Sequence, residues 1–155
     1  MTDRTDEFKA LVCGAVDRSA DRLVSINDTI HRHPEMGLKE YRACELLTTE
    51  LRRLGFETQT GIAGMDTAFS ATVSGDKPGP RIAFLAEYDA LPELGHACGH
   101  NVIAASAVGA ALALRKVVSE LGGTVVVYGT MIIVCNLMTD IAYALLDPRV
   151  RDQVG

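Results

Sequence analysis

The chain has 155 residues, which suits one domain of ordinary size with a buried core. It is 48% hydrophobic but only 5% aromatic, so the core has to be built mainly from Ala, Val, Leu and Ile. The net charge of −5 and the lack of Lys/Arg-rich runs argue against a nucleic-acid surface, and no cationic helical stripe indicates a membrane surface.

Targeting signals are not evident at the start of the chain. Its first residues are charged, and the apolar segment of a signal peptide does not follow them. The most apolar stretch, residues 124–138, is shorter than the roughly 20 residues that a membrane helix needs. Four cysteines without paired spacing predict free thiols in a reducing compartment. We therefore expect a cytoplasmic protein that binds neither membranes nor nucleic acid.

Two amphipathic helices are predicted in the first third of the chain. Apolar residues recur at intervals of three and four over residues 7–30, and again over residues 39–54. The first helix should end before His33-Pro34, because the residue preceding a proline is pushed out of the helical region. Gly55 follows the second helix in the position that favours a glycine C-cap.

The pattern then changes to strands. Residues 56–60 and 67–73 are rich in Thr, Phe and Val, and residues 81–88 form a mostly apolar run. An Ala-rich helix is predicted over residues 101–119, and a further strand over 124–128. The order strand, helix, strand predicts a parallel βαβ unit with a right-handed crossover. We therefore expect an α/β fold with helices packed on a mixed, mainly parallel sheet.

Six side chains that can bind a metal or transfer a proton lie in the loop after the 81–88 strand and at its borders. In open α/β sheets, ligands bind beyond the carboxyl ends of the strands. Only Gly99 separates Cys98 from His100, and it would let both side chains point at one centre. Thiolate, imidazole and carboxylate together are the ligands of zinc and its neighbours. The six side chains are those of Glu87, Asp89, Glu93, His96, Cys98 and His100.

Each of these residues also has a structural interpretation. A single cysteine at a helix start is commonly a small buried residue, and Asp89 before Ala-Leu-Pro is typical of a turn or cap. His31 and His33 lie at a predicted helix end, where capping or solvent exposure explains them. The spacing alone therefore leaves metal binding and a structural role as equal alternatives.

Three separated segments resemble the M20 family of metallopeptidases and amidohydrolases. They are I-H-R-H-P-E-M-G-L-K-E-Y-R-A, then L-A-E-Y-D-A-L-P-E-L-G-H-A-C-G-H-N, then V-V-V-Y-G-T, in the family's order over residues 8–130. The likeness is closest to the branch that holds aminobenzoyl-glutamate hydrolases. It implies a partial zinc-peptidase-like catalytic lobe over residues 1–130 and a divergent tail over 131–155, with the family's lid/dimerisation domain absent.

The resemblance also implies roles for individual residues. Cys98 takes the position of the bridging metal ligand and His100 that of a terminal ligand. Asp89, the candidate catalytic residue, matches the aspartate that supports the metal site, and Glu87 stands where many family members have a histidine ligand. The cofactor would be a two-metal centre of Zn²⁺ or Mn²⁺ that lowers the pKa of a bridging water. The substrate would be a small N-acyl or N-aroyl amino acid or a dipeptide.

The chain departs from the family after the third segment. The family continues Gly-Thr into Pro-Ala-Glu-Glu, where the first glutamate is the general base and the second a metal ligand. Here Gly129-Thr130 is followed by M-I-I-V-C-N, no carboxylate occurs before Asp140, and no histidine follows His100. Removal of a general base typically lowers a rate by about 10²–10⁴. We therefore expect weak activity or none, and a missing homodimer interface.

A truncation or an internal deletion would explain this departure. Residues 137–148, L-M-T-D-I-A-Y-A-L-L-D-P, are similar to the family's closing helix, which favours a deletion over a frameshift or an early stop. Two other classes of function remain as alternatives. One is a non-catalytic metal-binding or interaction module. The other is an oxidoreductase-like βαβ domain, which the absence of a G-x-G-x-x-G fingerprint disfavours.

Overall fold

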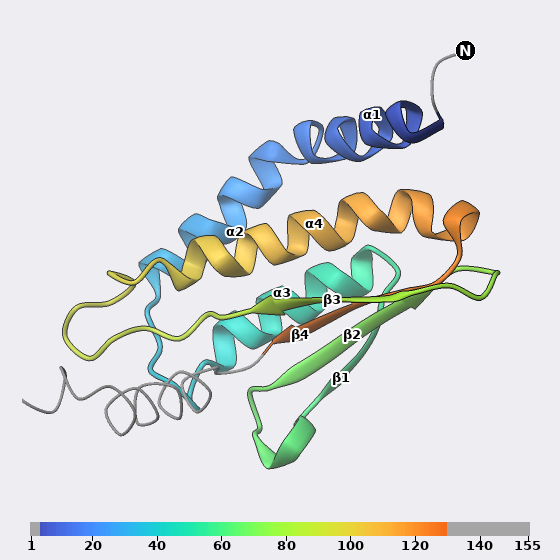
Figure 1. Cartoon of the computed structure of the whole chain (residues 1–155). Helices are drawn as coiled ribbons and strands as arrows, with labels where there is room; N and C mark the ends of the chain where they lie inside the picture. The colour runs from blue at the N-terminus through green and yellow to red at the C-terminus, as the bar shows by residue number, and fades with distance from the viewer. Residues whose placement is uncertain (1–3, 130–155) are drawn as a thin grey trace, which may run out of the picture.

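A computed structural model describes residues 4–129 of the chain (Figure 1). The strand extension expected at residues 132–134 and the helix expected at 137–148 lie outside the described residues. The elements in chain order are α1 (Arg4–Asp17), α2 (Ala20–Arg32), α3 (Tyr41–Arg53), β1 (Glu57–Thr60), the 3-10 turn η1 (Ile62–Gly64), β2 (Phe69–Ser74), β3 (Arg81–Ala86), α4 (His100–Leu121) and β4 (Thr124–Gly129).

The four described strands form one mixed sheet in the order β1-β2-β4-β3. β3 and β4 pair in parallel, with α4 as the crossover between them, so the predicted βαβ unit is confirmed. The β1–β2 and β2–β4 pairs are antiparallel. The described sheet is therefore less parallel than expected. β1 and β2 are consecutive strands joined by residues 61–68, a connection without a crossover helix, and such a connection places its strands antiparallel.

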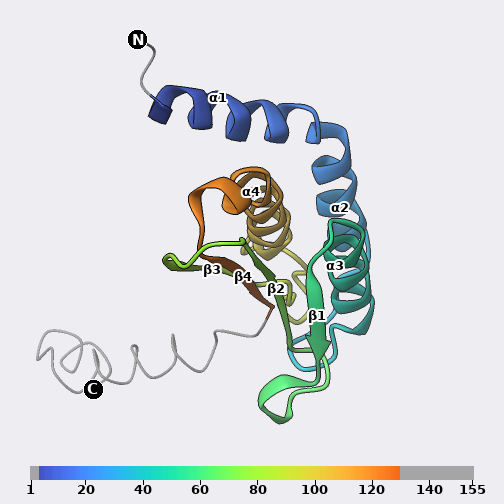
Figure 2. The same ribbon diagram turned by 90° about the vertical axis from the view of Figure 1, so that its right-hand side faces the viewer.

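The helices form two layers on the sheet. α3 packs on β1 and β2, and α4 packs on β3 and β4, so that both lie on one face of the sheet (Figure 2). α1 and α2 form an outer layer, in which both helices contact α4. This arrangement confirms the α/β class.

The expectation of one continuous helix over residues 7–30 is wrong. The helix breaks between Asp17 and Ala20, and Figure 2 shows α1 and α2 running in different directions on either side of the break. Ser19 is the N-cap of α2, with backbone angles outside the helical range. On either side of this break, both α1 and α2 pack on α4.

One described helix, α4, is long and apolar enough by length and composition to cross a membrane. α4 has 22 residues and is longer than the apolar stretch 124–138, which we judged too short for a membrane helix. However, 56% of its apolar stretch is buried inside the protein, between the sheet and the α1–α2 layer. This is the pattern of a core helix.

The core lies between the sheet and the helices and is built largely from Ala, Val and Leu, as expected. Phe69 of β2 is fully buried, and its ring stacks on that of Tyr88 with 6.0 Å between the centroids. The Tyr88 hydroxyl donates a hydrogen bond to the backbone carbonyl of Thr67. Burial raises the pKa of Tyr88, so the hydroxyl stays protonated and remains a donor. The core therefore anchors the chain immediately before Asp89.

A buried carboxylate joins α2 to α3. Glu50 is 1% exposed and accepts hydrogen bonds from Arg22, with Nη2 at 2.7 Å, and from Arg53. Burial alone would raise the pKa of Glu50. The hydrogen bonds and positive charges of Arg53 and Arg22 outweigh burial and hold that pKa below the ordinary value.

This depressed pKa predicts a loss of stability in acid. Glu50 contributes stability above the ordinary glutamate pKa, and the contribution disappears as the pH falls through the lower pKa of the folded state. We expect Glu50→Gln to lower the free energy of unfolding at neutral pH and to flatten its decline below about pH 4.3. Urea unfolding across that range measures both effects. Glu45→Gln, an exposed change on the same helix, should leave the acid profile unchanged.

Candidate active site

The loop from Glu87 to Gly99 leaves the carboxyl end of β3, where Ala86 pairs with Gly129 at the end of β4. The sequence predicted this location. The segment after α2 holds the loop in place, since the Ala90 amide donates to the Glu35 carbonyl at 2.7 Å. The Glu35 carboxylate in turn accepts from two amides in the first turn of α3, those of Arg42 and Ala43. The H-P-E-M segment therefore connects the loop to α3.

His100, the first residue of α4, lies between two carboxylates of this loop. Its Nδ1 is 2.8 Å from Oδ1 of Asp89 and 3.1 Å from the Asp89 carbonyl. Its Nε2 is 3.0 Å from Oε2 of Glu87. Asp89 is 3% exposed, so its carboxylate is committed to the ring of His100 and not to solvent. The structure thus brings together Asp89 and His100, two of the three predicted site residues.

The pairing of His100 with Glu87 is suited to a cation. When Nδ1 donates its proton to Asp89, Nε2 carries a lone pair that faces the Glu87 carboxylate. The Nε2 lone pair and the Glu87 carboxylate oxygen, 3.0 Å apart, would then repel each other unless both interact with a proton or a metal ion. An imidazole and a carboxylate are also ordinary ligands of zinc and manganese. The chemical nature of these two groups, the His100 imidazole and the Glu87 carboxylate, therefore suits a divalent cation.

Cys98 is the third predicted site residue. It is exposed on the turn before α4, and Gly99 has the left-handed conformation (φ +80°) that reverses the chain there. Within residues 4–129, no three His, Cys, Asp or Glu side chains form a group that could hold a metal ion. The described residues therefore offer part of a metal site, and a closed site would need further donors.

His96 is the histidine of the loop, and it is buried, with 7% of its surface exposed. Neither of its ring nitrogens has a hydrogen-bond partner among the described residues, and the Ile30 carbonyl approaches the ring without reaching hydrogen-bonding geometry. Burial lowers its pKa, and the neighbouring rings of His31 and His100 act in the same direction. His96 therefore packs as a neutral ring behind the site.

Two contributors to the site were not predicted from the sequence. Asn101 is buried and donates from Nδ2 to the Asn27 side chain on α2 at 2.8 Å, which fixes the start of α4. Glu35 supports the loop through its backbone carbonyl. Both Glu35 and Asn101 lie within the M20-like segments, which were a signal for their importance, but no pattern marked Asn27, the partner of Asn101.

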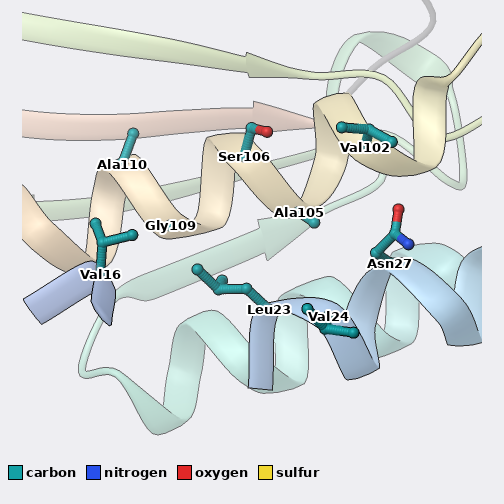
Figure 3. Close-up of a pocket in the computed structure, with 9 residues that line it drawn as sticks. All are labelled: Val16, Leu23, Val24, Asn27, Val102, Ala105, Ser106, Gly109 and Ala110. Atoms are coloured by element: carbon teal, nitrogen blue, oxygen red, sulfur yellow. The ribbon is translucent and has the colours of Figure 1, made fainter. Parts of the chain in front are cut away.

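A separate cavity of about 530 Å³ lies between the α1–α2 layer and the first half of α4 (Figure 3). Leu23 and Val24 of α2 face Ala105 and Gly109 of α4 across it. Among the described residues, its polar lining consists of Asn27 and Ser106, and neither can act as an acid, a base or a charged ligand. The reactive groups described above lie in the Glu87–His100 loop and not in this cavity.

The fold and the site together define an α/β lobe with a histidine held between two carboxylates at the carboxyl end of a parallel strand pair. No protein-family model matches the chain. The chain is 40% identical over 74% of its length to the Xaa-Arg dipeptidase of Mus musculus, of which it covers 30%. It is 32% identical over 79% of its length to one of the subunits of the p-aminobenzoyl-glutamate hydrolase of Escherichia coli K12, of which it covers 29%.

Solved structures show the same relationship. The chain superposes on the YXEP protein of Bacillus subtilis, a dinuclear metal-binding peptidase from the M20 family, with a TM-score of 0.62 and 29% identity. The superposition covers 70% of this chain and 34% of that one. The chain belongs to the M20 family of peptidases and amidohydrolases, as its three sequence segments predicted. It spans about 30% of the length of these curated relatives.

Proposed function

We propose that this chain supplies part of the active site of an M20-type, metal-dependent hydrolase that cleaves an amide bond to an amino acid. The observation that carries the proposal is the position of His100 between Asp89 and Glu87 at the carboxyl end of β3. The names of the two curated relatives, a dipeptidase and an aminobenzoyl-glutamate hydrolase, support this substrate class. The proposed substrate is a small N-acyl or N-aroyl amino acid, such as aminobenzoyl-glutamate, or a dipeptide.

In this proposal, His100 and Cys98 bind a divalent cation, Zn²⁺ or Mn²⁺, at the end of the strand pair. When bound, the cation supplies Lewis acidity to the scissile carbonyl and to water. Asp89 fixes the ring of His100 by accepting from Nδ1, which leaves Nε2 directed away from Asp89. Glu87 places a negative charge at Nε2, where it favours a cation.

We further propose that the chain by itself hydrolyses substrate weakly or not at all. No glutamate follows Gly129-Thr130 at the family's general-base position. Loss of a general base lowers a rate by about 10²–10⁴, and incomplete metal binding would lower it further. A non-catalytic metal-binding module is the alternative function, and the same two donors, Cys98 and His100, would support it.

Zinc content and hydrolysis, measured on the purified full-length chain, test the proposal. Zinc bound in a fixed ratio, with no release of glutamate from aminobenzoyl-glutamate, supports a metal-binding but inactive chain. Hydrolysis that Cys98→Ala abolishes would support the enzyme class and contradict the proposed inactivity. A chain that binds no zinc would contradict the proposed site.

The orienting role of Asp89 predicts the effect of Asp89→Asn. The amide has the size of the carboxylate but no negative charge, so it holds the ring of His100 less firmly and makes Nε2 a poorer ligand. Changes of this kind typically lower metal affinity by about 10–100-fold. Competition with a zinc-binding dye measures the affinity. Asp76→Asn, in the turn between β2 and β3, should leave the affinity unchanged.

A further inference from the structure

A second cavity, of about 220 Å³, lies where the α1–α2 junction, the end of α3 and the second half of α4 meet. Four of its lining side chains are cationic, and no acidic side chain lines it within the described residues. The chain as a whole carries a net charge of −5, so this concentration of positive charge is a local feature. The cationic residues are Arg18, Arg53, Arg115 and Lys116.

Internal ion pairs neutralise little of this charge. Arg53 pairs with Glu50, but that one carboxylate is shared with Arg22. Arg18, Arg115 and Lys116 form no ion pair with any acidic residue in the part of the chain that the structure describes. Like charges in a shared concave site repel one another unless solvent or an anion compensates them.

Arg115 is held in place more firmly than a surface arginine. Its guanidinium packs against Gly55 at the end of α3, where an added Cβ would lie 2.7 Å from Nη2. Gly55 also has φ +84°, so a larger residue at this position would be strained as well as crowded. The Nε of Arg115 is shielded from solvent and has no hydrogen-bond partner within residues 4–129. A buried donor without a partner carries a cost in free energy, so the protein itself compensates the guanidinium of Arg115 incompletely.

We propose that this cavity binds a small phosphate-class oxyanion, either free phosphate or the phosphate group of a small ester. Guanidinium groups match the oxygens of phosphate with paired N–H donors, and a lysine adds a point charge. The cavity volume of about 220 Å³ suits a small anion. Arg115 is 15 residues beyond His100 on α4, about 22 Å along the helix axis. The anion site is therefore separate from the proposed hydrolase site.

Isothermal titration of the full-length chain with inorganic phosphate, at an ionic strength held constant with potassium chloride, tests the proposal. We expect saturable binding that Arg115→Gln and Lys116→Gln each weaken by about 10-fold or more, because each removes a charged hydrogen-bond donor. Lys116 is exposed, so its replacement tests the site even if Arg115→Gln disturbs the fold. Lys39→Gln, an exposed change outside the cavity, is the matched control and should not alter the affinity.

Three further outcomes decide for or against the proposal. Tighter binding of a sugar phosphate than of phosphate, with the same loss in both variants, would support the site and assign the ester as its ligand. Absence of saturable phosphate binding would overturn the proposal. An equal loss of affinity in Lys39→Gln would also overturn it, because it would attribute the binding to overall charge.

Discussion

Replacing His100 with alanine is expected to remove nearly all metal binding from this chain. The imidazole is one of the two proposed protein ligands, and it is the only one whose position is fixed by neighbouring side chains. Outer-shell changes alone typically cost about 10–100-fold in metal affinity, so the loss of a ligand should exceed that range. Zinc retained after dialysis against a buffer of fixed free zinc, measured by mass spectrometry, gives the result.

His33→Ala is the matched control for His100→Ala. His33 is also a histidine at a helix end, but it is exposed and its Nδ1 lies 2.9 Å from the Thr29 carbonyl, outside the loop of the site. This variant should retain the zinc of the unmodified chain. Equal zinc loss in both variants would show that histidines bind the metal non-specifically, and unchanged zinc in His100→Ala would remove this residue from the proposed site.

Phe69→Ala is expected to have the largest effect on stability. Phe69 is fully buried in β2, stacks on Tyr88 and packs so closely against Gly129 that a Cβ added there would overlap its ring. Truncation of a buried phenylalanine to alanine costs about 3–5 kcal/mol, because apolar contact is lost and a cavity is left. Typical domains have only about 5–15 kcal/mol of stability, so much of the total would be lost. Denaturant unfolding measures the change.

Leu85→Ala is the control for the loss of apolar side-chain volume in a strand. Leu85 lies on β3 with 52% of its surface exposed, so its truncation leaves no closed cavity. We expect a change within about 1 kcal/mol. If Phe69→Ala were no more destabilising than Leu85→Ala, the packing of β2 against Tyr88 would not support the fold as described.

Local patterns were sufficient to predict the elements that carry the site. The helical spacing and Gly55 identified α3 to within a few residues of its ends. The apolar run of β3, the Ala-rich α4 and the apolar run of β4 defined the parallel crossover. The loop between β3 and α4 was placed at the correct end of the sheet because the carboxyl ends of parallel strands lie together.

Features that depend on distant contacts were not predictable. Helical periodicity continues across Ser19, so only packing on α4 shows that α1 and α2 are separate. The antiparallel placement of β2 beside β4 is likewise a choice among distant partners. In the site, spacing grouped Cys98 with His100, but it did not reveal that the folded loop also places His100 against Asp89 and Glu87. A side chain's partner depends on how the loop folds back, which spacing does not encode.

X-ray absorption at the zinc edge of the zinc-loaded chain tests most directly whether Cys98 and His100 share one metal. A cysteine ligand gives a sulfur shell at about 2.3 Å, and a histidine ligand a nitrogen shell at about 2.0–2.1 Å. We predict both shells in the unmodified chain and loss of the sulfur shell in Cys98→Ser. Zinc surrounded by nitrogen and oxygen alone, with a spectrum that Cys98→Ser leaves unchanged, would contradict the proposed half-site.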